Sequence, residues 1–77
     1  MNLAGTLYYY IIEYIIKVND QKLKDYSEEG HGAKSRAIKY AKTLDQKNHV
    51  EVVRRKWYMG ASYTGELVSK DVVWSNQ

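Results

Sequence analysis

The segment from Leu7 to Val18 constrains the fold of this chain more than any other part of its sequence. It reads Leu-Tyr-Tyr-Tyr-Ile-Ile-Glu-Tyr-Ile-Ile-Lys-Val, and every even-numbered residue in it is aromatic or aliphatic. That alternation is the period of a β-strand with one buried face, and β-branched and aromatic residues favour strands over helices. We therefore predict a strand over 7–18. The odd-numbered face, with Tyr9, Ile11 and Ile15, is also apolar, which indicates either a central strand or a face that meets a partner.

The remainder of the chain predicts one helix and further strands. Residues 33–46 place alanines and larger apolar residues on one arc of a helix, with lysine and arginine on the opposite arc. Two later segments are rich in valine and aromatic residues and are separated by a glycine-containing turn. The predicted elements are, in chain order, a possible short strand at 21–27, a loop at 28–32, the helix at 33–46, and strands at 50–59 and 63–74.

This order predicts a single domain over residues 1–77 of the α+β class. We expect a two-layer sandwich, in which one helix lies across one face of an antiparallel-rich sheet of three to four strands, in the order β-(β)-α-β-β. A chain of 77 residues is long enough for one small core. We expect that core to contain Tyr8, Tyr10, Ile12, Tyr14, Ile16, Ala37, Ile38, Ala41 and Leu44, with Val50, Val52, Val72 and Trp74 nearby.

The positive charge of the chain is concentrated in its middle third. The whole chain has a formal charge of +3, but residues 34–56 hold eight basic residues against two acidic ones. Such a segment favours an acidic partner, either nucleic acid or an acidic protein surface. Alternatively, these residues only keep the domain soluble, with the arginines paired to Glu51, Glu66 or Asp71 across a hairpin. The candidates for nucleic-acid binding are Arg36, Lys39, Lys42, Arg54, Arg55 and Lys56.

The residue types that catalysis and metal binding require are scarce. The chain has no cysteine, and its two histidines, His31 and His49, lie in no metal-spaced cluster and beside no evident nucleophile. A chain this small also rarely encloses a pocket. We therefore expect no enzyme, no catalytic residue, no metal site and no cofactor. The apolar run 7–16 is too short to span a bilayer and contains Glu13, so we expect no membrane association and a cytoplasmic location.

Tyrosine dominates the aromatic residues, with eight copies and no phenylalanine. Tyrosine is amphipathic and loses little rotamer entropy on burial, so it is enriched where proteins meet. The string Arg-Arg-Lys-Trp-Tyr at 54–58 places basic residues next to aromatic ones, a combination that binds acidic groups and stacks on bases. The candidates for contact with a partner are Tyr9, Arg54, Arg55, Tyr58 and Tyr63.

The overall plan resembles that of small β-α-β-β proteins encoded by bacteriophages and mobile elements, including anti-CRISPR and host-takeover inhibitors. The resemblance rests on the long first strand, the segment Ala-Lys-Ser-Arg-Ala-Ile-Lys-Tyr-Ala-Lys at 33–42, the strand 50–57 and Gly-Glu-Leu-Val at 65–68. It implies a non-catalytic inhibitor that blocks a host protein or nucleoprotein defence complex through an exposed surface, in the host cytoplasm if the chain is phage-encoded. Because this chain is basic, the resemblance does not extend to the acidic DNA mimics among those proteins. Two alternatives remain open, a nucleic-acid-binding domain that uses the 34–56 segment and a small homo-oligomer.

Overall fold

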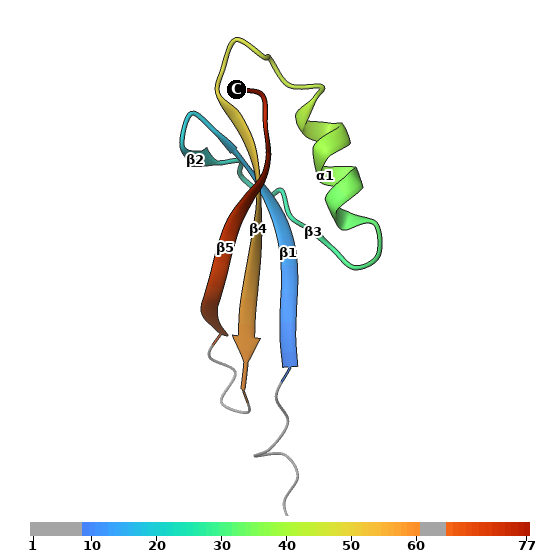
Figure 1. The fold of residues 1–77 in the computed structure, drawn as a ribbon, viewed down its shortest axis with the longest axis vertical. Coiled ribbons are helices and arrows are strands. Elements are labelled where there is room, and N and C mark those ends of the chain that lie inside the picture. The colour runs from blue at the N-terminus through green and yellow to red at the C-terminus, as the bar shows by residue number, and fades with distance from the viewer. Residues whose placement is uncertain (1–8, 61–64) are drawn as a thin grey trace, which may run out of the picture.

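The chain folds as one helix packed on an antiparallel sheet of five strands, in a computed structural model that describes residues 9–60 and 65–77 (Figure 1). The α+β class with a helix on one face of the sheet is confirmed. The predicted three to four strands become five because the chain forms two strands of only two residues each. The elements are β1 (Tyr9–Val18), β2 (Gln21–Lys22), β3 (Glu28–Glu29), α1 (Ala33–Ala41), β4 (Val50–Met59) and β5 (Gly65–Ser75).

Strand β1 lies between β4 and the two short strands. The strand order is β2-β1-β4-β5, and β3 also pairs with β1. β1 pairs with β4 along its whole length, from Tyr9 opposite Met59 to Val18 opposite Val50. The short strands pair only with the second half of β1. In the described part of the chain, residues 9–12 therefore have no strand on their outer side.

The segment between β1 and α1 differs most from its prediction. The two residues after β1 have positive φ angles of 51° and 70°, as in a two-residue hairpin turn, but the returning strand is Gln21–Lys22 rather than 21–27. Asp25, with φ of 61°, turns the chain again. Glu28–Glu29, predicted as loop, then pairs with β1. The second half of β1 is thus a central strand because two short strands share its outer edge.

The helix α1 is shorter than the sequence predicts. Beyond Ala41, the N–H groups of Thr43 and Leu44 donate to carbonyls three residues earlier instead of four. The Gln46 side chain then donates to the Ala41 carbonyl at 3.0 Å. Residues 42–46, predicted as helix, therefore form a tight turn from which Leu44 still packs on the core. In the part of the chain described here, no helix has the length and apolar character needed to cross a membrane.

The hydrophobic core lies between α1 and one end of the sheet. Ile16, Val50 and Val52 on the sheet and Ala37 and Ala41 on the helix are all 0% exposed. The alanines have short side chains, so the helix backbone lies close to the sheet. Burying a side chain of the size of Ile16 stabilises the fold by about 1.5–3 kcal/mol. Around this centre pack Tyr14, Val18, Leu23, Tyr26, Ile38, Leu44, Val73 and Trp74.

The helix covers only half of its face of the sheet, and this corrects the predicted core. A nine-residue helix is about 14 Å long, whereas the ten residues of β1 extend about 33 Å. Tyr10 and Ile12, both predicted to be buried, are 55% and 38% exposed as a result. Val72 is 54% exposed on the edge strand β5, whereas its neighbour Val53 on β4, on the same face away from α1, is 5% exposed. Tyr8, also predicted in the core, lies outside the described residues.

Candidate partner-binding surface

The part of the sheet beyond α1 is a three-stranded extension, which we call the arm (Figure 1). We define the arm as residues 9–12 of β1, 56–59 of β4 and 65–69 of β5, which pair side by side. Each strand continues into the half of the sheet that α1 covers, so ladder hydrogen bonds hold the arm to the core. We call the face that continues the surface under α1 the helix-side face, and the opposite one the far face.

The arm exposes large apolar side chains. Tyr9, Tyr10 and Val68 are 56%, 55% and 51% exposed, and Leu67 and Ile12 are 41% and 38% exposed. Single exposed apolar residues are ordinary on protein surfaces, but several of them close together mark a contact surface. Tyr10 and Ile12 lie together on the helix-side face of β1, and Tyr9 and Leu67 lie on the far face. Both faces of the arm therefore carry exposed apolar side chains.

An aromatic pair with a cation above it lies on the helix-side face of the arm. Tyr10 and Tyr58 are cross-strand neighbours whose ring centroids are 5.5 Å apart, with the rings tilted by 56°. The Lys56 ammonium lies 4.3 Å from the centroid of the Tyr10 ring, which is a cation–π contact. These contacts restrict the Tyr10 ring, so a partner that covers it loses less side-chain entropy on binding.

Glu13 is the centre of a polar network on the far face, at the base of the arm. Its carboxylate accepts hydrogen bonds from Arg55 Nη2 and Nε at 2.7 and 3.1 Å, from Trp57 Nε1 at 2.6 Å and from Ser27 Oγ at 2.7 Å. The Arg55 guanidinium also lies 5.2 Å from the centroid of the Trp57 ring. Only 13% of the Glu13 side chain and 22% of the Arg55 side chain are exposed. We call these four residues the Glu13 network, and it links β1, β4 and the segment before β3.

The network lowers the pKa of Glu13. Burial by itself raises the pKa of this carboxyl, because it disfavours the charged form. The hydrogen bonds from Ser27 and Trp57, together with the charge and hydrogen bonds of Arg55, outweigh burial, so the pKa lies below its ordinary value of 4.5. Glu13 is therefore ionised at neutral pH, and Arg55 neutralises its charge within the chain.

The two arginines proposed as partner contacts are paired within the chain and lie on opposite faces. Arg54 lies on the helix-side face, 3.4 Å from the carboxylate of Asp71, one of the hairpin partners considered from the sequence. Arg55 pairs on the far face with Glu13, which the sequence analysis did not select. The sequence signal for this pair is the single carboxylate of Glu13 within an apolar strand, because a buried carboxylate requires a cation or hydrogen-bond donors.

The basic residues proposed for nucleic-acid binding do not form one surface. The Arg36 guanidinium donates to Glu28 Oε1 at 2.7 Å and to two loop carbonyls at 2.7 and 2.9 Å, so it holds β3 against the start of α1. Lys39 on α1 and Lys42 directly after it are exposed and form no ion pair with any described residue. Lys56 lies over an aromatic ring on the arm. The cations are therefore divided among the helix and both faces of the sheet.

The five predicted partner contacts are only partly brought together. Tyr9 lies on the far face of the arm and Tyr58 on the helix-side face. Arg54 and Arg55 lie at the base of the arm, and Tyr63 lies outside the described residues. Four exposed residues of the arm were not among the predicted contacts: Tyr10, Ile12, Leu67 and Val68. Of these, Tyr10 and Ile12 were predicted to lie in the core.

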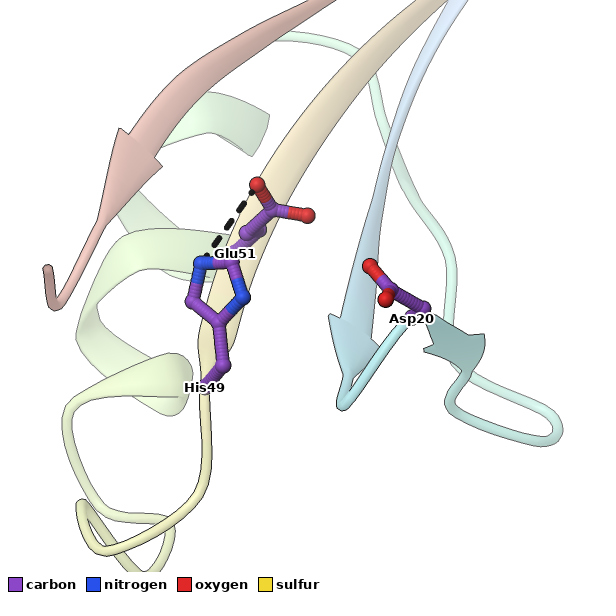
Figure 2. A group of neighbouring side chains, drawn as sticks. All are labelled: Asp20, His49 and Glu51. Carbon is purple, nitrogen blue, oxygen red and sulfur yellow. Dashed lines mark ion pairs between the residues drawn. The ribbon is translucent and has the colours of Figure 1, made fainter.

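A second group of functional side chains, Asp20, His49 and Glu51, lies at the other end of the sheet (Figure 2). Each offers one ligand atom, and these atoms lie within 4.8 Å of one another. No metal site was expected from the sequence, because the chain has no cysteine and its two histidines lie in no metal-spaced cluster. Asp20 is about thirty positions from His49 and Glu51 in the sequence, and the hairpin turn after β1 brings it close. Within the described residues, this is the group whose donors could hold a metal ion.

No protein-family model, curated protein or solved structure matches this chain. Its function is therefore inferred from the arm and its surroundings.

Proposed function

We propose that this chain is a small non-catalytic binding protein that attaches to a protein partner through the arm. The observation that carries the proposal is the exposure of Tyr9, Tyr10, Ile12, Leu67 and Val68 on strands that are fully paired within the arm. Aromatic side chains that are exposed yet held in place are typical of the residues that supply most of the binding energy at protein interfaces.

The distribution of charge favours a protein over nucleic acid. Binding to a phosphate backbone requires several uncompensated cations along one surface. Here Arg36, Arg54 and Arg55 each have a carboxylate partner within the chain, and the last two lie on opposite faces of the sheet. Of the two pairs at the base of the arm, that between Arg54 and Asp71 is the more accessible, since 64% of the Asp71 side chain is exposed. Arg54 can therefore exchange its ion pair with Asp71 for one with a carboxylate of a protein partner.

The shape of the edge strand favours contact through a face of the arm. In β5, Val68 and Val73 are extra residues at two shifts of register against β4. Such β-bulges disturb the row of free N–H and C=O groups and reduce pairing with another strand. On the β5 side, we therefore expect a partner to bind side chains on a face of the arm rather than the strand edge. Inhibition of a host protein, as the resemblance to small phage proteins implies, is the form of binding we propose.

The test is the capture of a partner followed by measurement of its affinity for arm variants. The untagged partner is recovered from a lysate of the source cells on immobilised chain, identified by mass spectrometry and purified. We expect Tyr10→Ser to weaken its binding at least tenfold, because truncation of a central aromatic contact costs more than about 1 kcal/mol. Tyr40→Ser is the matched control, since Tyr40 is a 43% exposed tyrosine on α1.

Tyr40 is a stringent control because it stacks on Tyr26 at 4.9 Å, so its loss perturbs the fold without touching the arm. Equal weakening by Tyr10→Ser and Tyr40→Ser would contradict the proposal, as would recovery of no stoichiometric protein. Light scattering measures whether the chain forms a homo-oligomer. A stable dimer that Tyr10→Ser dissociates would replace the proposal with the homo-oligomer alternative.

A further inference from the structure

The end of the sheet opposite the arm gathers three donors from two separate segments of the chain. Asp20 belongs to the turn after β1, and His49 and Glu51 flank the start of β4. His49 Nε2 lies 3.6 Å from Glu51 Oε2 and 3.3 Å from the hydroxyl of Ser75, near the end of β5. Figure 2 shows the Asp20 carboxylate turned toward the other two side chains. An imidazole nitrogen and two carboxylates thus converge on one point.

Backbone pairing fixes the two halves of this group relative to each other. The Asn19 N–H donates to the His49 carbonyl at 2.8 Å, and the His49 N–H donates to Asn19 Oδ1 at 2.9 Å. The turn that carries Asp20 is therefore tied to the strand that carries Glu51. The His49 side chain takes no part in these two bonds and remains available as a ligand.

The distances suit a small divalent ion after a modest movement of one side chain. Bonds of about 2.0–2.2 Å to nitrogen and oxygen place tetrahedral donors about 3.3–3.5 Å apart. The contact between His49 and Glu51 already has nearly this spacing. Asp20 is exposed at the end of a turn, so rotation of its side chain can shorten the remaining distances, which are at most 4.8 Å.

The charge of the group also favours a cation. Two carboxylates beside one imidazole give the group an excess of negative charge, and Glu51 is only 18% exposed at its side chain. Lys17 is the cross-strand neighbour of Glu51, yet in the described part of the chain neither Lys17 nor any other lysine or arginine forms an ion pair with Glu51 or Asp20. The half-buried carboxylate is thus left with His49 as its ion-pair partner.

We propose that Asp20, His49 and Glu51 bind one divalent transition-metal ion of the Zn²⁺ class. An imidazole donor favours zinc and its neighbours over Mg²⁺ and Ca²⁺, which prefer sites made only of oxygen. The bound ion would join the turn after β1 to β4. The site lies at the opposite end of the sheet from the arm, so the proposal does not depend on partner binding.

The test is titration of the untagged, metal-free full chain with Zn²⁺ by calorimetry, and with Co²⁺ by visible absorption. We expect one ion per chain, bound in the presence of excess Mg²⁺, and a higher midpoint of thermal unfolding with Zn²⁺ because the ion binds the folded chain. His49→Ala should weaken Zn²⁺ binding at least tenfold. His31→Ala is the matched control, since His31 is the other histidine of the chain and lies exposed outside the group.

Asp20→Asn provides a second variant, because its exposed side chain can be changed without touching the core. It should weaken Zn²⁺ binding several-fold, whereas Asp25→Asn, in the next turn, should leave it unchanged. Absence of saturable 1:1 binding would overturn the proposal. Equal losses in His31→Ala and His49→Ala, or full affinity in Asp20→Asn, would overturn it as well.

Discussion

Replacing Glu13 by glutamine tests the network that supports the arm. Glu13→Gln keeps the size of the side chain but removes the charge that faces Arg55 and one of the two acceptor oxygens. The carboxylate oxygen Oε2 accepts hydrogen bonds from Arg55 and Trp57, and Oε1 accepts one from Ser27. An amide can keep these contacts by donating its NH2 to the Ser27 hydroxyl, so the expected loss comes from the missing charge. The variant leaves a guanidinium that is 22% exposed without its counter-ion.

The expected loss in the free energy of unfolding depends on how far the Glu13–Arg55 pair is exposed to water. Removing one member of a fully buried ion pair costs about 3–5 kcal/mol, and a hydrogen bond to a charged group contributes about 1.5–3 kcal/mol. Glu13 and Arg55 retain some contact with water, so we expect a loss of about 2 kcal/mol in the free energy of unfolding. For a domain of this size, each kcal/mol lowers the unfolding midpoint by about 4–8 °C. The midpoint should therefore fall by roughly 10 °C.

Thermal and urea unfolding followed by circular dichroism measure this loss, and Glu66→Gln is the control because Glu66 is exposed on β5. Adding Arg55→Met and the double variant completes a mutant cycle, which should give a coupling energy of about 1 kcal/mol or more. A loss below about 0.5 kcal/mol for Glu13→Gln, similar to an ordinary surface change, would refute the reasoning.

The same network predicts the behaviour of the chain in acid. The pKa of Glu13 is lowered in the folded chain, because its hydrogen bonds and the charge of Arg55 outweigh burial. The stabilisation is complete above the unfolded value of 4.5 and is lost as the pH falls through the lower folded pKa. Glu13→Gln should therefore lose less stability than the wild-type chain as the pH falls below 4.5. The loss that remains should include that of Glu28, because a hydrogen bond from Arg36 lowers its pKa as well.

Three further substitutions probe the segment from Tyr26 to the start of α1. Gly32→Ala should lower the free energy of unfolding by about 1–2 kcal/mol, because φ is +78° and the new Cβ would lie 3.1 Å from an Arg36 guanidinium nitrogen. Gly30 has a φ of +83°, but nothing lies within 4 Å of a Cβ added there. Gly30→Ala should therefore lower the free energy of unfolding less in the same thermal unfolding assay. Burial and the neighbouring Glu28 raise the pKa of Tyr26 to about 12, so Tyr26→Phe should remove one tyrosine that ionises near pH 12 from an ultraviolet titration. The wild-type chain should also lose stability between pH 10 and about 12 as this tyrosine ionises.

The regular elements were predictable where one segment determines them by itself. β4 spans the predicted 50–59, because its valines, arginines and aromatic residues form an uninterrupted run without a turn signal. Glu28–Glu29 could not be found in this way. Two glutamates before a glycine are typical of a loop, and they pair with β1 because Arg36 and Tyr26 hold Glu28 in place from other parts of the chain.

The exposure of the arm can be predicted from the sequence by comparing the length of the predicted helix with that of the first strand. Even the predicted 14-residue helix would be only about 21 Å long, whereas a strand over 7–18 extends about 40 Å. One helix could therefore never have covered all the even-numbered side chains of that strand. The pairing of Glu13 with Arg55 was harder to predict, because it depends on the register between strands that are about forty residues apart.

The arm remains extended because its base is polar and its strands are continuous with the core. An apolar base would gain stability by attracting the neighbouring Ile11 and Leu67 side chains into a compact cluster, since burial of apolar surface is favourable wherever the backbone allows it. The Glu13 network instead satisfies its hydrogen bonds among side chains on the far face of the sheet. Tyr9, Tyr10, Ile12, Leu67 and Val68 of the arm are 38–56% exposed. A partner that buries Tyr10 and Ile12 gains the hydrophobic free energy that the short helix leaves unused, and it meets a surface already fixed by cross-strand pairing.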